Sequence, residues 1–139
     1  VALEKDNIFI LCIKLEGKLT LDGLVAAQYV LIPLQCEYFA LEGLSLLLKT
    51  IKKVQIELNP GLKIGGILFT MYDKRTNLAH EVVQEVTSYF KDKVFRTIIP
   101  RNVRISEAPS HSKPINIYDP NCIGAASYKK LADEVITYV

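Results

Sequence analysis

The 139-residue sequence contains no tryptophan, one methionine and three cysteines, and these scarcities exclude several kinds of protein. The cysteines, Cys12, Cys36 and Cys122, are widely spaced and form no C-x-x-C metal or redox motif. We expect each cysteine to be reduced and to pack as a small buried apolar side chain, as in a protein of a reducing compartment. His80 and His111 lie far apart with no second ligand at metal-binding spacing, so we expect no metal site.

Long apolar runs and a strong net charge are also lacking. No stretch reaches the roughly 18 consecutive apolar residues that a membrane-spanning helix needs, and no signal peptide is visible. Both observations favour a cytoplasmic protein without a membrane partner. Seventeen basic and fifteen acidic residues give a net charge of +2, which argues neither for nor against nucleic acid. The sequence begins with Val1 rather than methionine, which we interpret as the sign of a fragment.

Basic residues do concentrate in one segment, between positions 91 and 113. An excess of positive charge there suits anion binding, but lysines and arginines scattered over a solvated face would give the same pattern. Both interpretations stay open at this point. The segment contains six basic residues, Lys91, Lys93, Arg96, Arg101, Arg104 and Lys113, and two acidic ones, Asp92 and Glu107.

Half of the residues are apolar, enough for one domain with a hydrophobic core. Strand-like and helix-like periodicities alternate along the chain. This alternation predicts an α/β fold with three layers, in which helices cover both faces of a mostly parallel sheet and functional residues lie where strands end. We expect strands over residues 8–13, 29–34, 62–70 and 94–99, and helices over 20–27, 38–58, 77–91 and 121–139.

Apolar stripes and glycines refine this prediction. The pair Gly65-Gly66 in a predicted strand would let a neighbour approach closely or permit a bulge, and Asn59-Pro60-Gly61 should end the preceding helix. Each long helix should bury one apolar stripe. The stripes are Leu41, Leu44, Leu48, Ile51 and Leu58 in the first, Leu78, Val82, Val86 and Tyr89 in the second, and Tyr128, Leu131, Val135 and Tyr138 in the last.

Three turns that follow predicted strands carry distinctive sequences: IPLQCEYFALEGL at 32–44, LFTMYDKRTNL at 68–78 and IPRNVRISEAPSHSKP at 99–114. Together they closely resemble the carboxy-terminal half of the ParA/Soj family of chromosome and plasmid partitioning ATPases, over roughly residues 20–138. We interpret residues 1–139 as a single partial domain of this family in which residues 1–19 depart from the family pattern. The resemblance implies a P-loop NTPase-like fold, with ATP and magnesium as ligands of full-length members.

The phosphate-binding motif G-x-x-x-x-G-K-[ST] of such ATPases is absent. Its nearest counterpart, Glu16-Gly17-Lys18, has one glycine and a leucine where the hydroxyl residue should follow. In the family, the strand before residue 20 ends in an aspartate that assists magnesium and water, and alignment on Cys12 places Leu11 there. A leucine side chain cannot hold a metal-bound water. We therefore expect no catalytic residue in this chain and leave open whether it is an enzyme.

The resemblance assigns two groups of candidate site residues. Pro100, Arg101 and Asn102 correspond to the turn that covers the adenine in family members, and Arg75 and Arg104 correspond to positions that bind DNA nonspecifically. A proline ring can pack on a purine, and guanidinium groups can contact phosphates without reading bases.

Each of these residues also has a structural interpretation. Pro100 would end a strand and Asn102 would cap the following helix. Arg75 and Arg104 would form surface ion pairs with glutamates, and Asp73 is expected to be a turn or cap residue. The candidate ion-pair partners are Glu81, Glu85 and Glu107.

Full-length relatives act as ATP-switched dimers that bind the nucleoid and are released by a ParB-type partner. The resemblance thus implies a fragment of a chromosome or plasmid partitioning protein, cytoplasmic and nucleoid-associated, with nonspecific DNA, a ParB-type protein and a second copy or partner ATPase as its partners. Two alternatives remain open. One is a noncatalytic interaction module that pairs with a complete ATPase, and the other is a nonfunctional gene remnant.

Overall fold

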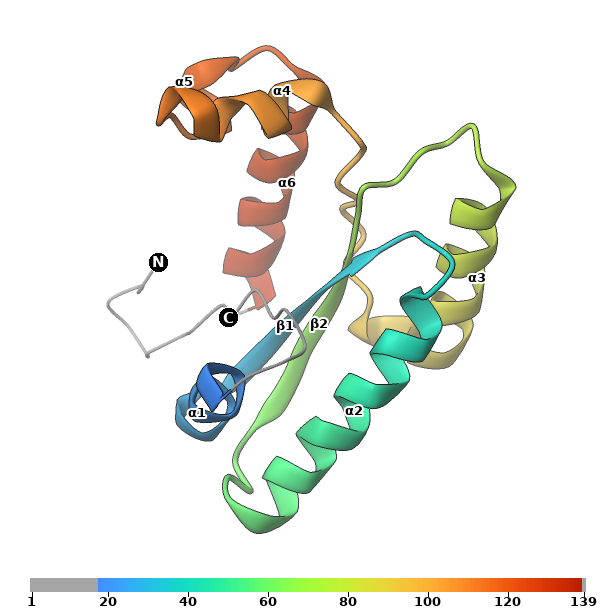
Figure 1. Cartoon of the computed structure of the whole chain (residues 1–139), viewed down its shortest axis with the longest axis vertical. Coiled ribbons are helices and arrows are strands. Elements are labelled where there is room, and N and C mark those ends of the chain that lie inside the picture. Colours follow the sequence, from blue (N-terminus) through green and yellow to red (C-terminus); the bar gives the residue numbers. More distant parts are fainter. Residues whose placement is uncertain (1–17, 139) are drawn as a thin grey trace.

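The computed structural model describes residues 18–138, in which two parallel strands lie between helices on both faces (Figure 1). The strands are β1 (Tyr29–Gln35) and β2 (Lys63–Thr70). The helices are α1 (Lys18–Ala26), α2 (Ala40–Glu57), α3 (Asn77–Phe90), α4 (Val103–Glu107), α5 (Ile115–Tyr118) and α6 (Ile123–Tyr138), with short 3-10 turns η1 (Lys91–Lys93) and η2 (Ala108–His111). The predicted α/β fold is confirmed. The strand expected over 8–13 lies outside the described residues.

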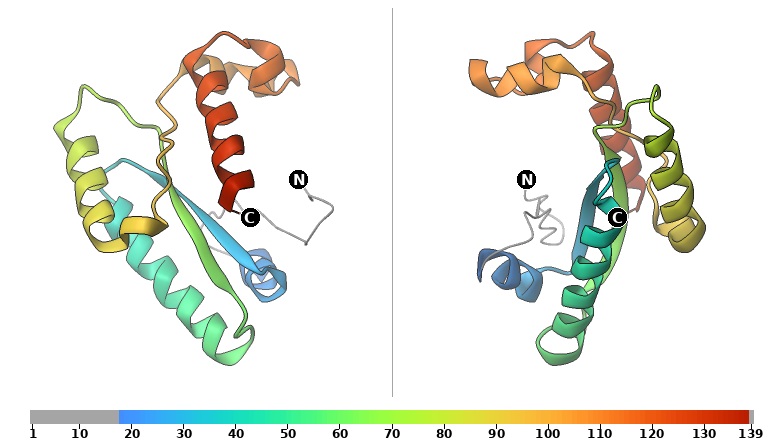
Figure 2. Two further views of the ribbon diagram at one scale, coloured as in Figure 1. Left: turned by 180° about the vertical axis from the view of Figure 1, so that it is seen from behind. Right: turned by 45° about the vertical axis from the view of Figure 1, so that its right-hand side comes forward.

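Side chains of β1 alternate between two apolar cores because successive residues of a strand point to opposite faces of the sheet. Val30, Ile32 and Leu34 are buried in the larger core with residues of α2 and α3, whereas Leu31 packs in a smaller core with Leu68 of β2. The smaller core also receives side chains of α4 and α6. Figure 2 shows α2 and α3 on one face of the strands and α6 on the other.

The predicted stripes are only partly right. Leu44 and Ile51 of α2, Val82 and Val86 of α3, and Leu131 and Val135 of α6 do face the cores. The predictions for four positions are wrong: Leu58, beyond the end of α2, is 52% exposed, Tyr89, near the end of α3, is 77% exposed, and Leu78 and Tyr128 are also exposed. The side chain of Tyr138 lies outside the described part of the chain. Leu47, Val54 and Ala79, which the stripes omitted, are buried.

The segment 94–99 is extended but does not form the regular strand expected there. It is flanked by two parallel bridges, one between Val94 and Ile67 of β2 and one between Pro100 and Tyr72, which follows β2. Between these bridges, the amides of Arg96 and Thr97 donate to the Glu134 carboxylate of α6, at 2.7 and 2.9 Å. A side chain therefore takes the hydrogen bonds that a neighbouring strand would otherwise accept, which is why the ladder is interrupted.

The glycine pair of β2 permits both a bulge and a close approach, as predicted. The register pairs Val30 with Ile64 but Leu31 with Gly66, so Gly65 is the extra residue of a bulge. A Cβ atom at Gly66 would lie 2.4 Å from Cε2 of Phe95. The missing side chain therefore leaves room for the buried Phe95 ring, which anchors segment 94–99 beside β2.

Asn59 ends α2 as expected, but its side chain has a second role that the sequence did not reveal. Its Nδ2 lies within hydrogen-bonding distance of the carbonyls of Leu24, Val25 and Ala27, at 3.1, 3.0 and 2.8 Å. These are carbonyls at the end of α1, where no further turn of helix supplies donors. Asn59 thus joins α1 to the turn that precedes β2.

Candidate functional site

Two of the three distinctive turns meet at the carboxyl ends of the strands. The loop between β2 and α3, residues 71–76, lies beside the turn 100–102 because Tyr72 N donates to Ile99 O at 3.2 Å and Arg101 N donates to Tyr72 O at 3.0 Å. Figure 1 shows the extended segment that leads to this turn running along β2. In parallel sheets this edge is where ligands usually bind.

The two turns line a cavity of about 540 Å³, which we call the loop cavity. Three cationic residues, Lys74, Arg75 and Arg101, lie around it together with Asp73 and Pro100. Its other lining residues are Tyr72, Ile98, Val103, Ile123 and Ser127. The structure thus brings together three of the five candidate site residues. Asn102 and Arg104 are not among the residues that line the cavity.

Asp73 holds Arg75 through three hydrogen bonds. The Arg75 amide donates to Oδ1 at 3.0 Å, Nε donates to the same oxygen at 2.9 Å, and Nη2 donates to Oδ2 at 2.7 Å. These bonds from Arg75, helped by the nearby charge of Arg101, hold the pKa of Asp73 well below its usual range. The expected turn role of Asp73 is confirmed. The alternative in which Arg75 is a surface ion-pair residue holds only with a different partner, Asp73 instead of Glu81 or Glu85.

His80 fastens the β2–α3 loop to α3. Its Nε2 lies 3.2 Å from the Lys74 carbonyl, and its Nδ1 lies 3.1 Å from the Tyr72 hydroxyl. Since a carbonyl only accepts, we assign the proton of the neutral ring to Nε2, so that Nδ1 accepts from Tyr72. At the end of the loop, Thr76 caps α3 by accepting a hydrogen bond from the Ala79 amide. His80 therefore shapes the loop that carries Arg75.

The turn 100–102 has the structural roles anticipated for it. Pro100 ends the extended segment, and Asn102 Oδ1 accepts from the Arg104 amide at 2.8 Å, which caps α4. No hydrogen bond in the described part of the chain uses Asn102 Nδ2. Arg101 Nη2 lies 3.4 Å from Glu37 Oε1, and both side chains are more than half exposed, so this ion pair is weak. The adenine contact of the turn stays a prediction.

Arg104 is part of a polar cluster on α4 and α5. Its Nη1 lies 3.0 Å from Glu107 Oε2, and its Nε lies 3.5 Å from Asp119 Oδ2. The Tyr118 hydroxyl also donates to Glu107, at 3.1 Å. Hydrogen bonds from Arg104 and then Tyr118 lower the pKa of Glu107, so the ion pair expected with Glu107 is confirmed.

The basic segment 91–113 does not form one surface. Lys91 and Lys93 belong to η1, next to the bridge between Ile67 and Val94, whereas Arg101 follows the bridge at Tyr72. The bridging residues Ile67 and Tyr72 are five positions apart, on the order of 15 Å for a largely extended chain. The lysines are thus not neighbours of Arg101, and the basic residues of this segment do not gather in one patch.

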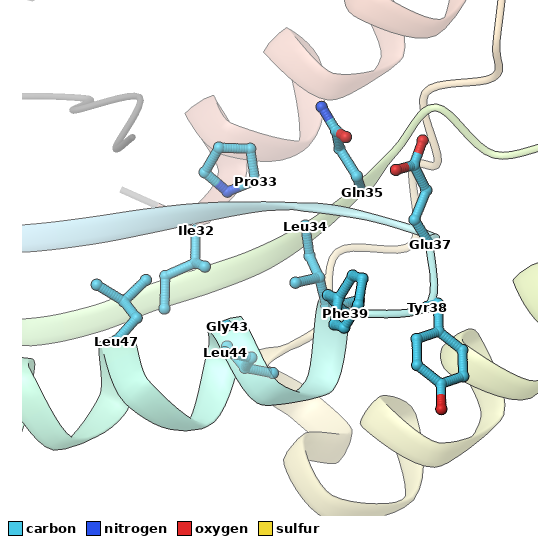
Figure 3. A pocket seen from close by; sticks show the side chains of 11 residues that line it. Ile32, Pro33, Leu34, Gln35, Glu37, Tyr38, Phe39, Gly43, Leu44 and Leu47 are labelled. Atoms are coloured by element: carbon cyan, nitrogen blue, oxygen red, sulfur yellow. The ribbon is translucent and has the colours of Figure 1, made fainter. Parts of the chain in front are cut away.

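The third distinctive turn, at 32–44, lines a separate cavity of about 440 Å³ between β1 and α2. Figure 3 shows Ile32 and Leu34 directed toward α2 and Pro33 and Gln35 toward the other side of the strand. The cavity is mostly apolar, and Tyr38 beside it is 76% exposed. Glu37 of this turn contacts Arg101, which lines the loop cavity.

Neither the described cysteines nor other side chains suggest metal or thiol chemistry. Within residues 18–138 no group of three or more histidine, cysteine, aspartate or glutamate residues lies close enough to hold a metal ion. Burial raises the pKa of the Cys36 thiol to about 11, which disfavours the reactive thiolate. Cys122 is only half-buried, and its Sγ accepts from the Ala125 amide in the first turn of α6. Cys12 lies outside the described residues.

No helix within residues 18–138 is long and apolar enough to cross a membrane.

Sequence comparisons identify related proteins. A family model described as an AAA domain matches residues 1–64. The chain is 66% identical to the chromosome-partitioning ATPase Soj of Treponema pallidum, 57% identical to the sporulation initiation inhibitor protein Soj of Bacillus subtilis and 56% identical to the chromosome partitioning protein ParA of Myxococcus xanthus. These matches cover 94%, 94% and 98% of this chain and 52%, 51% and 48% of the relatives. The chain therefore spans about half the length of the relatives it matches.

Solved structures give the same fold. Cobyrinic acid a,c-diamide synthase from Mycobacterium smegmatis with bound ATP analogue and magnesium matches with a TM-score of 0.68 and 37% identity. The match covers 86% of this chain and 43% of the synthase. A second structure of that synthase, with bound ADP and magnesium, matches with a TM-score of 0.54 and 44% identity over 63% of this chain and 36% of the synthase.

Proposed function

Since the chain belongs to the ParA/Soj family of chromosome partitioning proteins, we propose that it supplies the DNA-contacting and adenine-side part of such a protein. The observation that carries this proposal is the loop cavity, where Lys74, Arg75 and Arg101 gather at the carboxyl ends of the strands beside Pro100. Cations on exposed loops attract the phosphates of nucleic acids and nucleotides alike.

The exposure of the two candidate arginines supports DNA as a ligand. The side chain of Arg75 is 80% exposed and that of Arg104 is 55% exposed, so both guanidinium groups are accessible to a phosphate backbone. Both arginines lie on a loop or a very short helix, and such positions suit contact with phosphates better than the reading of bases. We propose that the chain binds duplex DNA nonspecifically through Arg75 and Arg104.

Our proposal for a nucleotide concerns its base end. Pro100, Arg101 and Asn102 offer a ring, a cation and an amide for a purine. For a magnesium triphosphate, by contrast, the sequence lacks the phosphate-binding motif, and residues 18–138 hold no metal-binding group. We therefore propose adenine-side contacts for this chain and no role in phosphate chemistry.

The remaining partners follow from the family. We propose that the chain works with a second copy or a complete ATPase, that it associates with the nucleoid, and that a ParB-type protein regulates it. One observation favours the alternative of a noncatalytic pairing module: within the described residues, β1 pairs only with β2, on one of its edges. An unpaired strand edge is a template for another chain.

DNA binding can be tested by changing both candidate arginines. The chain should bind fluorescent duplexes of unrelated sequence with similar affinity, and Arg75→Ala with Arg104→Ala should weaken binding to all of them. If each arginine neutralises one phosphate, the double substitution should lower the slope of log affinity against log salt by roughly 1.8. Circular dichroism checks the fold, because Arg104 also supports α4 and α5.

The matched control is Lys129→Ala with Lys130→Ala on α6, which removes the same charge at exposed positions away from the loop cavity. This control should change affinity and salt slope little. If the arginine variant binds duplex DNA as well as the parent at low salt, or loses no more affinity than the lysine variant, the assignment of Arg75 and Arg104 is wrong.

A further inference from the structure

We propose that Asp73 is a built-in competitor of DNA phosphate for Arg75, and that it thereby sets how strongly the β2–α3 loop binds DNA. In the absence of DNA the carboxylate occupies the guanidinium, and a phosphate binds by displacing it. This inference concerns regulation of the site described above and rests on the proposed DNA-binding function.

The geometry of the pair carries the proposal. Nε and Nη2 of Arg75 donate to the two different oxygens of Asp73, at 2.9 and 2.7 Å. Arginine binds phosphate with the same side-by-side arrangement of two N–H groups. A phosphate and the Asp73 carboxylate therefore compete for the same donors.

The two partners differ in exposure, which determines how the pair can open. The Asp73 side chain is 20% exposed and accepts a further bond from the Arg75 amide, so the loop holds the carboxylate in place. The guanidinium is 80% exposed and can turn toward an incoming phosphate. Asp73 also experiences the charge of Arg101 across the loop cavity, so a cation stays near the carboxylate after Arg75 leaves.

Protonation does not release Arg75 near neutral pH. The bonds from Arg75 hold the pKa of Asp73 well below the usual value for an aspartate, which keeps the carboxylate ionised throughout the neutral range. Release of Arg75 from Asp73 then depends on an anion that competes for the guanidinium, or on salt, which screens the attraction between two exposed charges. Two further arginines near the site are held differently: Arg101 has one long contact at 3.4 Å, and Arg104 contacts carboxylates of two different residues.

The test is a double-mutant cycle measured with a fluorescent duplex of random sequence. Asp73→Asn removes the charge but keeps an oxygen that can accept from the Arg75 amide, so the turn is retained. This variant should bind the duplex roughly two- to five-fold more tightly than the parent, the range that an exposed ion pair spans. In an Arg75→Ala background the same substitution should change affinity little. Asp73→Ser, which also preserves a turn acceptor, provides a second variant if the asparagine destabilises the fold.

The cycle separates competition from a general effect of charge. A gain that persists in the Arg75→Ala background overturns the proposal, because it reports only the loss of a negative charge. An unchanged or weaker affinity of Asp73→Asn also overturns it, since Asp73 would then merely orient Arg75. Arg75→Ala alone tests the proposed function, which predicts that this variant loses affinity for the duplex. If Arg75→Ala loses affinity but Asp73→Asn gains none, Arg75 does bind DNA and the proposed competition by Asp73 is wrong.

Discussion

At the scale of single residues, two side chains organise backbone that lies more than thirty positions away. Asn59 donates to the carbonyls at the end of α1, and Glu134 accepts from the amides of Arg96 and Thr97. In the sequence Asn59 belongs to a helix-ending turn, and Glu134 is one of several polar residues of the last helix. The roles of Asn59 and Glu134 in joining distant segments follow from the structure and not from the sequence.

Replacing Glu134 with glutamine should destabilise the protein. Glutamine offers one acceptor oxygen where the carboxylate accepts from two amides, so we expect a loss of about 1–2 kcal/mol in the free energy of unfolding at pH 7, the lower part of the range for charged hydrogen bonds because solvent reaches the group. Urea denaturation measures this loss. Glu81→Gln, at an exposed position of α3, is the matched control and should change stability little.

The same substitution predicts a pH dependence. Burial alone would raise the pKa of Glu134, but the hydrogen bonds from Thr97 and Arg96 outweigh it and lower the pKa. A carboxyl whose folded pKa is depressed stabilises the protein above its unfolded pKa of about 4.3, and this stability is lost as the pH falls through the lower folded value. The difference between parent and Glu134→Gln should therefore be constant from pH 6 to 8 and shrink below about 4.3. A difference that grows on acidification would contradict the assigned role.

At the scale of elements, β2 is the centre of the fold. It pairs with β1 on one side and with segment 94–99 on the other, and its residues contribute to both cores. Two neighbouring glycines make this possible for different reasons. Gly65 forms the bulge, and Gly66 leaves space for Phe95. The turn 100–102 thus depends indirectly on the packing at Gly66.

A matched pair of substitutions can separate these two glycines. Gly66→Ala would place Cβ 2.4 Å from Cε2 and 2.9 Å from Cδ2 of Phe95, and the buried ring has little room to move. We expect a loss of about 1–3 kcal/mol, as for other overpacked cores. At Gly65 the nearest atom to a new Cβ is the Val30 carbonyl oxygen, at 3.4 Å, so Gly65→Ala should be much milder. Thermal denaturation measures the loss of stability in both variants. Equal losses would show that contact with Phe95 is not the reason why Gly66 must be a glycine.

At the scale of the whole molecule, the chain shares its fold with a synthase that binds an ATP analogue and magnesium, but its sequence lacks the phosphate-binding motif G-x-x-x-x-G-K-[ST]. In phosphoryl transfer, most of the rate enhancement comes from groups that position the phosphates and neutralise their charge. The chain spans about half of its relatives, and the part of it that the structure describes carries the groups that we propose to contact DNA and the base of a nucleotide.

We therefore expect the purified 139-residue chain to release phosphate from magnesium ATP only at the background rate. The chromosome-partitioning ATPase Soj of Treponema pallidum, 66% identical over the shared region, is a suitable reference assayed in parallel. Activity that co-purifies with the chain through successive columns and scales with its concentration would show that phosphate chemistry does not need the missing motif.

Much of the fold could be predicted because it depends on local patterns. The alternation of apolar runs and amphipathic stretches indicated α1, β1, α2, β2, α3 and α6 with boundaries close to those observed. Local chemistry likewise indicated the turn role of Asp73 and the cap formed by Asn102. Such features depend on residues two to four positions apart, so the sequence contains all the partners that they need.

Features that depend on distant partners could not be predicted in this way. The interruption of segment 94–99 needs a carboxylate from α6. The separation of Lys91 from Arg101 needs the pairing of the chain with β2. The sequence by itself determined the class of fold, the family resemblance and the candidate residues. Tertiary structure alone decided which of those residues share the loop cavity, because a hydrogen bond or an ion pair forms with the partner that the fold brings within about 3 Å, whatever its distance along the chain.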